Sequence, residues 1–270
     1  MVRISMNELT TYRWSFEEDV RHYAESGLDA IAVWRQKLSD FGEAKGIELI
    51  RDSHLAVSCL LWAGGFTGSD GRSYKESVQD AIEAIQLAAD MQAGCLTVYS
   101  GARAGHTHNH ARSLLNNALK ELLPAAEQQG VTLALEPVHA GCAREWTFLT
   151  DVDETFRLID QWDHPCLKLA FDTYYFGRDS QRVGQLADMV PRLAIVHLGD
   201  GRQEPDGDQD RCLLGDGEVP LAALVDQLTR ADYDGFFDIK LMGEEIETTD
   251  YVQLIQQCAQ RVGQWIGAAS

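Results

Sequence analysis

Three short apolar runs in the second half of the chain each carry, at or near their end, a residue that can bind a divalent cation. The runs are VTLALEPVH, LKLAFD and LAIVHLGD, and the residues are Glu136, Asp172 and His197. Each run has the length of a buried strand and is followed by Gly, Pro or polar residues. Helix-like segments separate the runs, and this alternation is typical of a parallel sheet. Because the functional residues of closed parallel barrels lie where strands end, these side chains are candidates for one site.

The same alternation extends over the whole chain. We predict eight strands, each followed by a helix, and this number closes a (β/α)8 barrel, the TIM-barrel architecture of the α/β class. The predicted strands are 2–7, 28–34, 55–65, 95–101, 131–139, 167–172, 193–200 and 236–243. The predicted helices are 15–27, 41–54, 73–94, 111–130, 150–162, 181–192, 219–235 and 248–267. A length of 270 residues is typical of one such barrel, so 1–270 is predicted as a single domain. The alternative, an open doubly wound sheet, requires a glycine-rich phosphate loop after the first strand, where this chain has MNELTTYRW.

The composition of the chain argues against several kinds of binding partner and cellular compartment. A net charge of −19 argues against nucleic acid, which requires a basic face. The six cysteines are scattered singly without a CxxC pair, which indicates neither a zinc ribbon nor a disulfide framework. No apolar run is long enough to span a bilayer, and the first residues have no apolar signal region. We therefore expect a cytoplasmic protein without a membrane or nucleic-acid partner.

Glu, Asp and His at three strand ends suit a cation such as Mn²⁺, Mg²⁺, Co²⁺ or Zn²⁺. Such a metal ion polarises a carbonyl and a neighbouring hydroxyl. It stabilises the enediolate that forms when a proton leaves the carbon between them. A single Glu or Asp at a strand end is more simply interpreted as an ordinary solvated carboxylate, but this explains candidate ligands at three consecutive strand ends less well.

Four segments together resemble the xylose-isomerase-like superfamily of sugar phosphate isomerases and epimerases, which are TIM barrels. ALEPVHAGCAREW is similar to the "LEPLHP…DR" segment of that family, and FDTYYF lies where the family has "D-x-x-H". VHLGDG followed by DRCLLGDGEVPL is similar to its "H-x-x-D…R…G-x-G" segment. YDGFFDIKLMGEEIE is similar to its final "GYxGxxxVEI" strand. The resemblance extends from the fourth predicted strand to the C-terminus.

This resemblance implies metal ligands at Glu136, Asp172 and His197, with His139 and Arg211 near the substrate. It also implies a small sugar or polyol-like substrate. Members of the superfamily include ketose epimerases, aldose–ketose isomerases, inosose-handling enzymes and dehydroshikimate dehydratases.

Two residues depart from the family pattern. The fourth metal ligand of the family, a Glu on the eighth strand that also acts as an acid/base group, is replaced here by Lys240. In FFDIKL the apolar residues alternate with Asp238 and Lys240, so Lys240 is expected to point away from its apolar neighbours and into the barrel mouth. Tyr175 stands where the family usually has His. Tyr can hydrogen-bond a sugar hydroxyl but is a poor ligand for these metals at neutral pH.

The replacement of Glu by Lys240 changes the net charge that a metal site would have. Three carboxylates, a neutral His and a dication sum to −1. Two carboxylates, a His and one ammonium, without the metal, also sum to −1. The ammonium can therefore take the place of the cation between Glu136 and Asp172. Metal and ammonium together would place like charges in a confined site, unless Lys240 deprotonates and serves as a general base. A third interpretation is that Lys240 reaches solvent and binds nothing. We expect metal binding to be weak.

Other candidate residues follow the remaining predicted strands. Trp14, Trp34 and Trp62 come after the first three strands and either form walls of a sugar pocket or belong to the core. The loop 201–211 is long, acidic and glycine-containing, and is expected to close over ligand and to bring Arg211 to the substrate.

The sequence therefore predicts a sugar isomerase or epimerase that transfers a proton next to a carbonyl. Glu136 is one acid/base group, and Lys240 occupies the position of the other. A related lyase or dehydratase is an alternative within the same chemistry. An alternative of another class is a sugar-binding or regulatory barrel that lost catalysis with its fourth metal ligand. Association into a homo-oligomer stays open.

Overall fold

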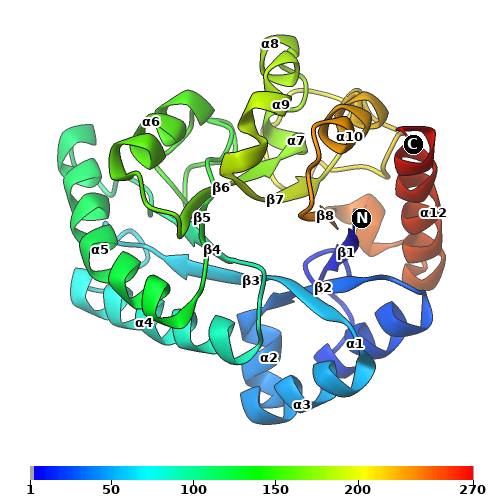
Figure 1. Ribbon diagram of the computed structural model, residues 1–270, viewed down its shortest axis with the longest axis horizontal. Helices are drawn as coiled ribbons and strands as arrows, with labels where there is room; N and C mark the ends of the chain where they lie inside the picture. The colour runs from blue at the N-terminus through cyan, green and yellow to red at the C-terminus, as the bar shows by residue number, and fades with distance from the viewer. Residues whose placement is uncertain (1–2, 270) are drawn as a thin grey trace.

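The eight strands form a closed parallel barrel, which confirms the predicted TIM-barrel fold (Figure 1). The structure is a computed structural model and describes residues 3–269; the predicted first strand included Val2, which lies outside the described residues. Each strand pairs with the next in chain order, and β1 pairs with β8. The strands are β1 (Arg3–Asn7), β2 (Ala30–Trp34), β3 (Ala56–Gly64), β4 (Leu96–Tyr99), β5 (Leu133–Leu135), β6 (Leu167–Asp172), β7 (Leu193–Leu198) and β8 (Phe236–Ile239).

The helices surround this barrel, as Figure 1 shows. The longer ones are α1 (Phe16–Glu25), α3 (Glu43–Ser53), α4 (Tyr74–Asp90), α5 (His108–Gln129), α6 (Val152–Trp162), α10 (Leu221–Arg230) and α12 (Tyr251–Ala269). The shorter ones are α2 (Arg35–Phe41), α7 (Thr173–Phe176), α8 (Ser180–Gly184), α9 (Leu186–Met189), the 3₁₀ helix η1 (Val190–Arg192) and α11 (Glu244–Glu247).

Two predicted helices differ from the structure. The predicted helix 41–54 is α3, which begins at Glu43, and a separate helix α2, which was not predicted, precedes it. Gly42 separates the two with φ of 105°, a conformation that a side chain would disfavour. The predicted helix 181–192 is replaced by α8, α9 and η1. Pro191 supplies no N–H for a continuing helix, which is consistent with a break at this point.

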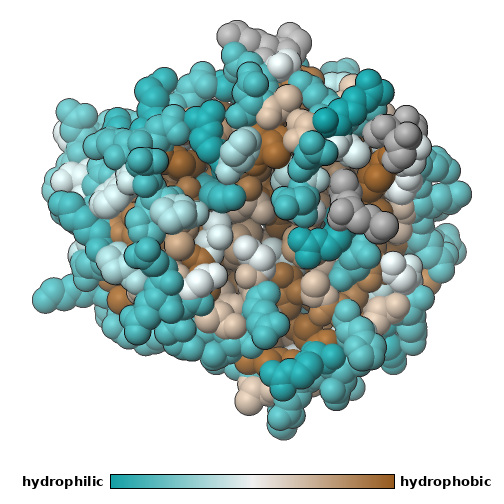
Figure 2. Space-filling view, viewed as in Figure 1, coloured by the Kyte–Doolittle hydropathy of each residue, from teal (hydrophilic) through white to brown (hydrophobic). Residues whose placement is uncertain are grey.

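Local sequence signals explain where two outer helices begin. Ser15 and Ser73 are the N-caps of α1 and α4, and each accepts a hydrogen bond from the backbone N–H three residues on. The glutamates at those positions, Glu18 and Glu76, bind back to the cap backbone and complete capping boxes. On the face shown in Figure 2, hydrophilic residues cover most of the periphery, in agreement with the high net charge. In the part of the chain that the structure describes, no helix combines the length and the apolar character that crossing a bilayer requires.

The barrel interior is mainly apolar towards the N-terminal ends of the strands, here called the lower layers, and polar at their C-terminal ends. The lower layers are built mainly from small residues, among them Ala30, Ala32, Cys59, Cys95, Ala134 and Ala170. On β8, Phe237 and Ile239 belong to the large core between strands and helices. Their neighbour Asp238 therefore faces the interior, where it bonds to Asn7 of β1. Lys240 lies on the same side of the chain, as the alternation in FFDIKL predicts.

A buried ionic cluster connects the loop after β1 to α1 and α2. Lys37 Nζ lies 2.5 Å from Asp19 Oδ2 and donates to the backbone oxygens of Glu8 and Thr11. The Thr11 hydroxyl donates to the other oxygen of Asp19 at 2.6 Å. Burial raises the pKa of Asp19 to about 6 although the charge of Lys37 opposes the shift. This cluster holds the first loop of the barrel mouth in place.

The raised pKa of Asp19 predicts a stability that decreases with pH. An unfolded Asp has a pKa of about 3.9, so between pH ~4 and ~6 the folded state holds a proton that the unfolded state has lost. The difference in unfolding free energy between wild type and Asp19→Asn should fall by up to about 1.4 kcal/mol per pH unit in this window, and then level off. Urea denaturation at a series of pH values measures it. Parallel stability curves for the two proteins would contradict the prediction.

Candidate active site

Four of the residues predicted from the sequence converge at the mouth of the barrel. Asp172 ends β6, His197 lies in β7, and Glu136 and Lys240 directly follow β5 and β8. All four side chains are buried. Lys240 Nζ lies 2.7 Å from Glu136 Oε1 and 3.4 Å from Asp172 Oδ2, so the ammonium bridges the two carboxylates.

The environment of Lys240 favours its charged form. Only 2% of the residue is exposed, so it does not reach solvent. Burial alone would lower the pKa of Lys240, but the carboxylates of Glu136 and Asp172 outweigh burial and hold the pKa above its usual value. The site therefore contains an ammonium at neutral pH, rather than the neutral amine that a general base requires.

Arg211 is the second buried cation and binds the other side of Asp172. Its two terminal nitrogens lie 3.1 and 3.0 Å from the two oxygens of Asp172. Burial would raise the pKa of Asp172, but Arg211 and Lys240 outweigh it and lower the pKa. Arg211 also donates to the backbone oxygen of Lys240 at 3.2 Å. The structure thus places Arg211 behind the site, with its guanidinium on Asp172, and not in the lining of the cavity where a substrate clamp is expected.

His197 lies between Glu136 and a residue that the sequence analysis did not select. Its Nδ1 lies 2.7 Å from Asp238 Oδ2, which also accepts a hydrogen bond from Asn7 at 2.8 Å. Its Nε2 lies 3.8 Å from Glu136 Oε2 and is a buried polar atom without a hydrogen-bond partner. Asp238 was detectable as the other inward-facing polar residue of FFDIKL. Tyr99, which donates to Glu136 Oε2 at 2.8 Å, was detectable only by its position at the end of β4.

The carboxylates of this site are engaged in a way that does not fit a divalent cation. Both oxygens of Asp172 face Arg211, and the two oxygens of Glu136 are bound by Lys240 and Tyr99. Within residues 3–269, no three His, Cys, Asp or Glu side chains are grouped so that they could hold a metal ion. A dication at this point would meet the ammonium of Lys240, and like charges in a buried site repel strongly.

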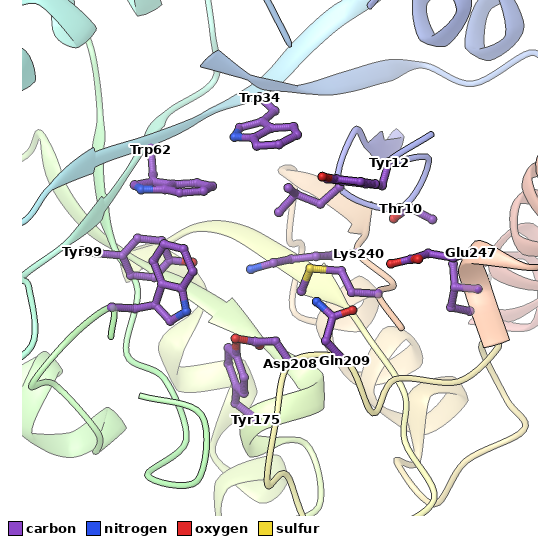
Figure 3. A pocket seen from close by; sticks show the side chains of 14 residues that line it. Thr10, Tyr12, Trp34, Trp62, Tyr99, Tyr175, Asp208, Gln209, Lys240 and Glu247 are labelled. Carbon is purple, nitrogen blue, oxygen red and sulfur yellow. The ribbon is translucent and has the colours of Figure 1, made fainter. Parts of the chain in front are cut away.

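A cavity of about 450 Å³ opens above Lys240 (Figure 3). Trp34 and Trp62 line it, together with Tyr99 and Tyr175. Trp14 does not: it stacks on His22 and meets Tyr251 edge-on, packed against the core. Of the three tryptophans named from the sequence, the structure therefore brings two to the cavity.

The loop 201–211 covers one side of the cavity, with Asp208 and Gln209 in the lining. Tyr174 donates to the backbone oxygen of Gly207 at 2.6 Å, and Tyr175 donates to the carboxylate of Asp208. His139 Nδ1 lies 3.0 Å from the backbone oxygen of Pro205, so His139 contacts this loop and lies outside the cavity lining. The loop is therefore bound by side chains of α7 and of the segment that follows β5.

The bond between Tyr175 and Asp208 predicts how easily this loop opens. A hydrogen bond to a charged group stabilises by about 1.5–3 kcal/mol, so Tyr175→Phe should speed backbone amide exchange in 203–210 by roughly tenfold or more. Hydrogen–deuterium exchange by mass spectrometry measures this. The matched control is Tyr74→Phe, which removes an exposed hydroxyl bond to Glu121. Equal loop exchange in the two variants would show that Tyr175 does not hold the loop.

Comparison with known proteins agrees with the fold. The family described as xylose isomerase-like TIM barrel matches residues 20–258. The L-ribulose 3-epimerase of Mesorhizobium japonicum is 23% identical over 238 residues, covering 85% of this chain and 76% of that protein.

Two solved structures have the same fold over nearly the whole chain. The IOLI protein, solved with a binding zinc atom, has a TM-score of 0.85 and 18% identity, covering 100% of this chain and 99% of that one. A structure of L-ribulose 3-epimerase has a TM-score of 0.80 and 20% identity, covering 100% of this chain and 96% of that one.

Proposed function

Because the chain belongs to the xylose isomerase-like TIM-barrel family, we propose that it is a sugar epimerase or isomerase in which Lys240 takes the place of a divalent metal ion. The observation that carries the proposal is the position of Lys240 Nζ between Glu136 and Asp172. The similarity to L-ribulose 3-epimerase supports a small ketose as the class of substrate. No step of the proposed reaction passes through a metal ion.

Lys240 is suited to stabilise negative charge on a substrate oxygen. An ammonium has three N–H groups. One is bound to Glu136 and a second faces Asp172, so the third remains for a ligand in the cavity that Lys240 lines. In a buried site a fixed cation stabilises an oxyanion far more than it would in water. The carbonyl oxygen of the sugar is the group expected at this N–H.

Glu136 is the proposed acceptor of the carbon-bound proton. Glu136 is not among the residues that line the cavity, but its two contacts, Lys240 and Tyr99, are. The proposal therefore requires the sugar to reach between these two side chains, so that its C–H bond meets the carboxylate. The C–H bond next to the carbonyl breaks and an O–H bond forms on Glu136. The electron pair becomes the C=C bond of an enediolate, whose charge lies on the oxygen facing Lys240. Return of the proton from Glu136 to the neighbouring carbon gives an isomer. An epimer requires that a water molecule in the cavity delivers a proton to the opposite face of the same carbon, while Glu136 releases the proton it accepted to solvent.

The experiment is incubation of the chelator-treated protein with L-ribulose and other free pentuloses and hexuloses in D₂O, followed by NMR. We expect deuterium at the carbon next to the carbonyl of at least one sugar, together with its epimer or isomer. Binding of a sugar, detected by tryptophan fluorescence, without deuterium in any of them would favour the non-catalytic sugar-binding barrel. Loss of water from the sugar would favour the related dehydratase. Either result would overturn the proposal.

A further inference from the structure

The cavity wall around the ammonium of Lys240 is aromatic. Trp62, Tyr99 and Trp146 belong to this wall, and their ring centroids lie 5.1–6.0 Å from one another. Trp34 continues the wall, because β2, which it ends, pairs directly with β3, which carries Trp62. Figure 3 shows the nitrogen of Lys240 pointing towards Trp62 and Tyr99. Aromatic rings offer a large apolar contact area to the C–H groups of a sugar, but they bring no positive charge to a phosphate group.

The cavity has little positive charge to offer any anion. Within residues 3–269, Lys240 is the one Lys or Arg in the lining, and its ammonium is bound to Glu136 and faces Asp172. Arg211 lies outside the lining with its terminal nitrogens on Asp172. Phosphate groups are usually bound by free N–H groups of Arg or Lys. The single N–H that Lys240 has left is the one that the proposed reaction assigns to the carbonyl oxygen.

Glu247 is a carboxylate of the lining that no cation neutralises. It is the last residue of α11, and Figure 3 shows its carboxylate pointing from this helix into the cavity. Its neighbour Glu245 is paired with Arg202 at 2.6 Å. The side chain of Glu247, in contrast, makes no hydrogen bond or ion pair in the part of the chain that the structure describes. Asp208, the other carboxylate of the lining, accepts a hydrogen bond from Tyr175.

From these observations we propose that Glu247 determines substrate specificity and restricts the substrate to ketoses without a phosphate group. The proposal rests on the proposed function, which places the carbonyl oxygen at Lys240. From this point the ketose extends along the aromatic wall on one side and towards Glu247 on the other. The carboxylate of Glu247 accepts a hydrogen bond from a terminal hydroxyl. A terminal phosphate, which carries a charge of about −1.5 to −2 at pH 7, is repelled. This specificity differs from the sugar phosphate that the family resemblance suggests.

Binding of matched sugars, followed by tryptophan fluorescence, tests this specificity. The probes are D-ribulose, D-xylulose, D-fructose and D-tagatose, and the terminal phosphates of the same four ketoses. We expect at least one free ketose to bind, and each phosphate to bind roughly tenfold or more weakly than its free ketose. A phosphate that binds within tenfold of its free ketose, or more tightly, would overturn the proposal. Absence of binding by all the free ketoses would overturn it as well.

A matched pair of variants assigns the effect to Glu247. In Glu247→Lys the phosphates should gain roughly tenfold or more in affinity relative to the free ketoses, because the charge beside the terminal group changes by two units. Glu244→Lys makes the same charge change on the same helix, at an exposed residue outside the cavity lining, and should leave the preference as it is. An unchanged preference in Glu247→Lys, or an equal change in both variants, would contradict the role of Glu247.

Proton exchange in D₂O with the same sugars separates this proposal from the proposed function. Exchange on free and phosphorylated ketoses alike would overturn the specificity and leave the proposed function standing. Selective binding of free ketoses that is lost in Glu247→Lys, without exchange on any of them, would support the specificity and overturn the proposed function.

Discussion

Lys240→Met should lower the rate of proton exchange at the substrate carbon by about 10²–10³-fold, the loss typical when one oxyanion-stabilising donor is removed. Met keeps the length of the side chain and removes its charge. The enediolate then forms without a cation beside its oxygen, because the terminal nitrogens of Arg211 are bound to Asp172 and to the backbone oxygen of Lys240, outside the cavity lining. Deuterium incorporation into the ketose identified with the wild-type protein measures the change.

The same substitution also tests the buried ion pair. Removing one partner leaves the carboxylates of Glu136 and Asp172 without their bridging cation, which should cost about 3–5 kcal/mol of stability. Glu136→Gln combined with Lys240→Met should regain part of the stability and none of the exchange. Lys168→Met is the control, since Lys168 lies on β6 outside the cavity lining and is partly exposed. Exchange at the wild-type rate in a folded Lys240→Met protein would show that Lys240 takes no part in the reaction.

Lys240→Glu should raise the affinity for Mn²⁺ at least tenfold over the wild type. The substitution changes the charge beside Glu136 and Asp172 by two units and supplies an oxygen ligand. Nε2 of His197 is a buried nitrogen without a partner and lies 3.8 Å from Glu136. Arg211 still contacts Asp172 in this variant and limits the gain. Even so, the electrostatic change should exceed the ~1.4 kcal/mol that corresponds to a tenfold change in affinity.

Electron paramagnetic resonance of free Mn²⁺, titrated into chelator-treated wild type and variant, measures that affinity. The control is Lys168→Glu, which makes the same charge change away from the cavity. Tight binding by the wild type with no gain in Lys240→Glu would mean that the ammonium does not oppose a metal ion.

The parts of this site that could be predicted from the sequence are those set by strand geometry. Strand ends of a closed barrel meet at one mouth, so Glu136, Asp172 and His197 were expected together from their positions alone. The period of two in FFDIKL gave the direction of Lys240, because Phe237 and Ile239 must face the helices.

The parts that could not be predicted depend on how loops fold back. Arg211 lies at the end of a long loop, and its pairing with Asp172 needs a contact across 39 positions of the chain that no local pattern determines. Trp34 is the last residue of β2, whereas Trp14 lies in the segment between β1 and α1, where its ring stacks on His22. The short helix α7 lies directly after β6, and α11 follows the segment 240–243 after β8; both are too short to show a helical period.

The central claim is that the ammonium of Lys240 takes the role of a metal ion in this site. The rate of deuterium exchange into the ketose tests this claim most directly. Deuterium exchange into the ketose should be measured with wild-type protein after chelator treatment and again with increasing Mn²⁺. We predict full activity without added metal and no stimulation by Mn²⁺, because Lys240 already holds the position between Glu136 and Asp172. Exchange that is absent after chelation and returns in proportion to bound Mn²⁺ would contradict the claim.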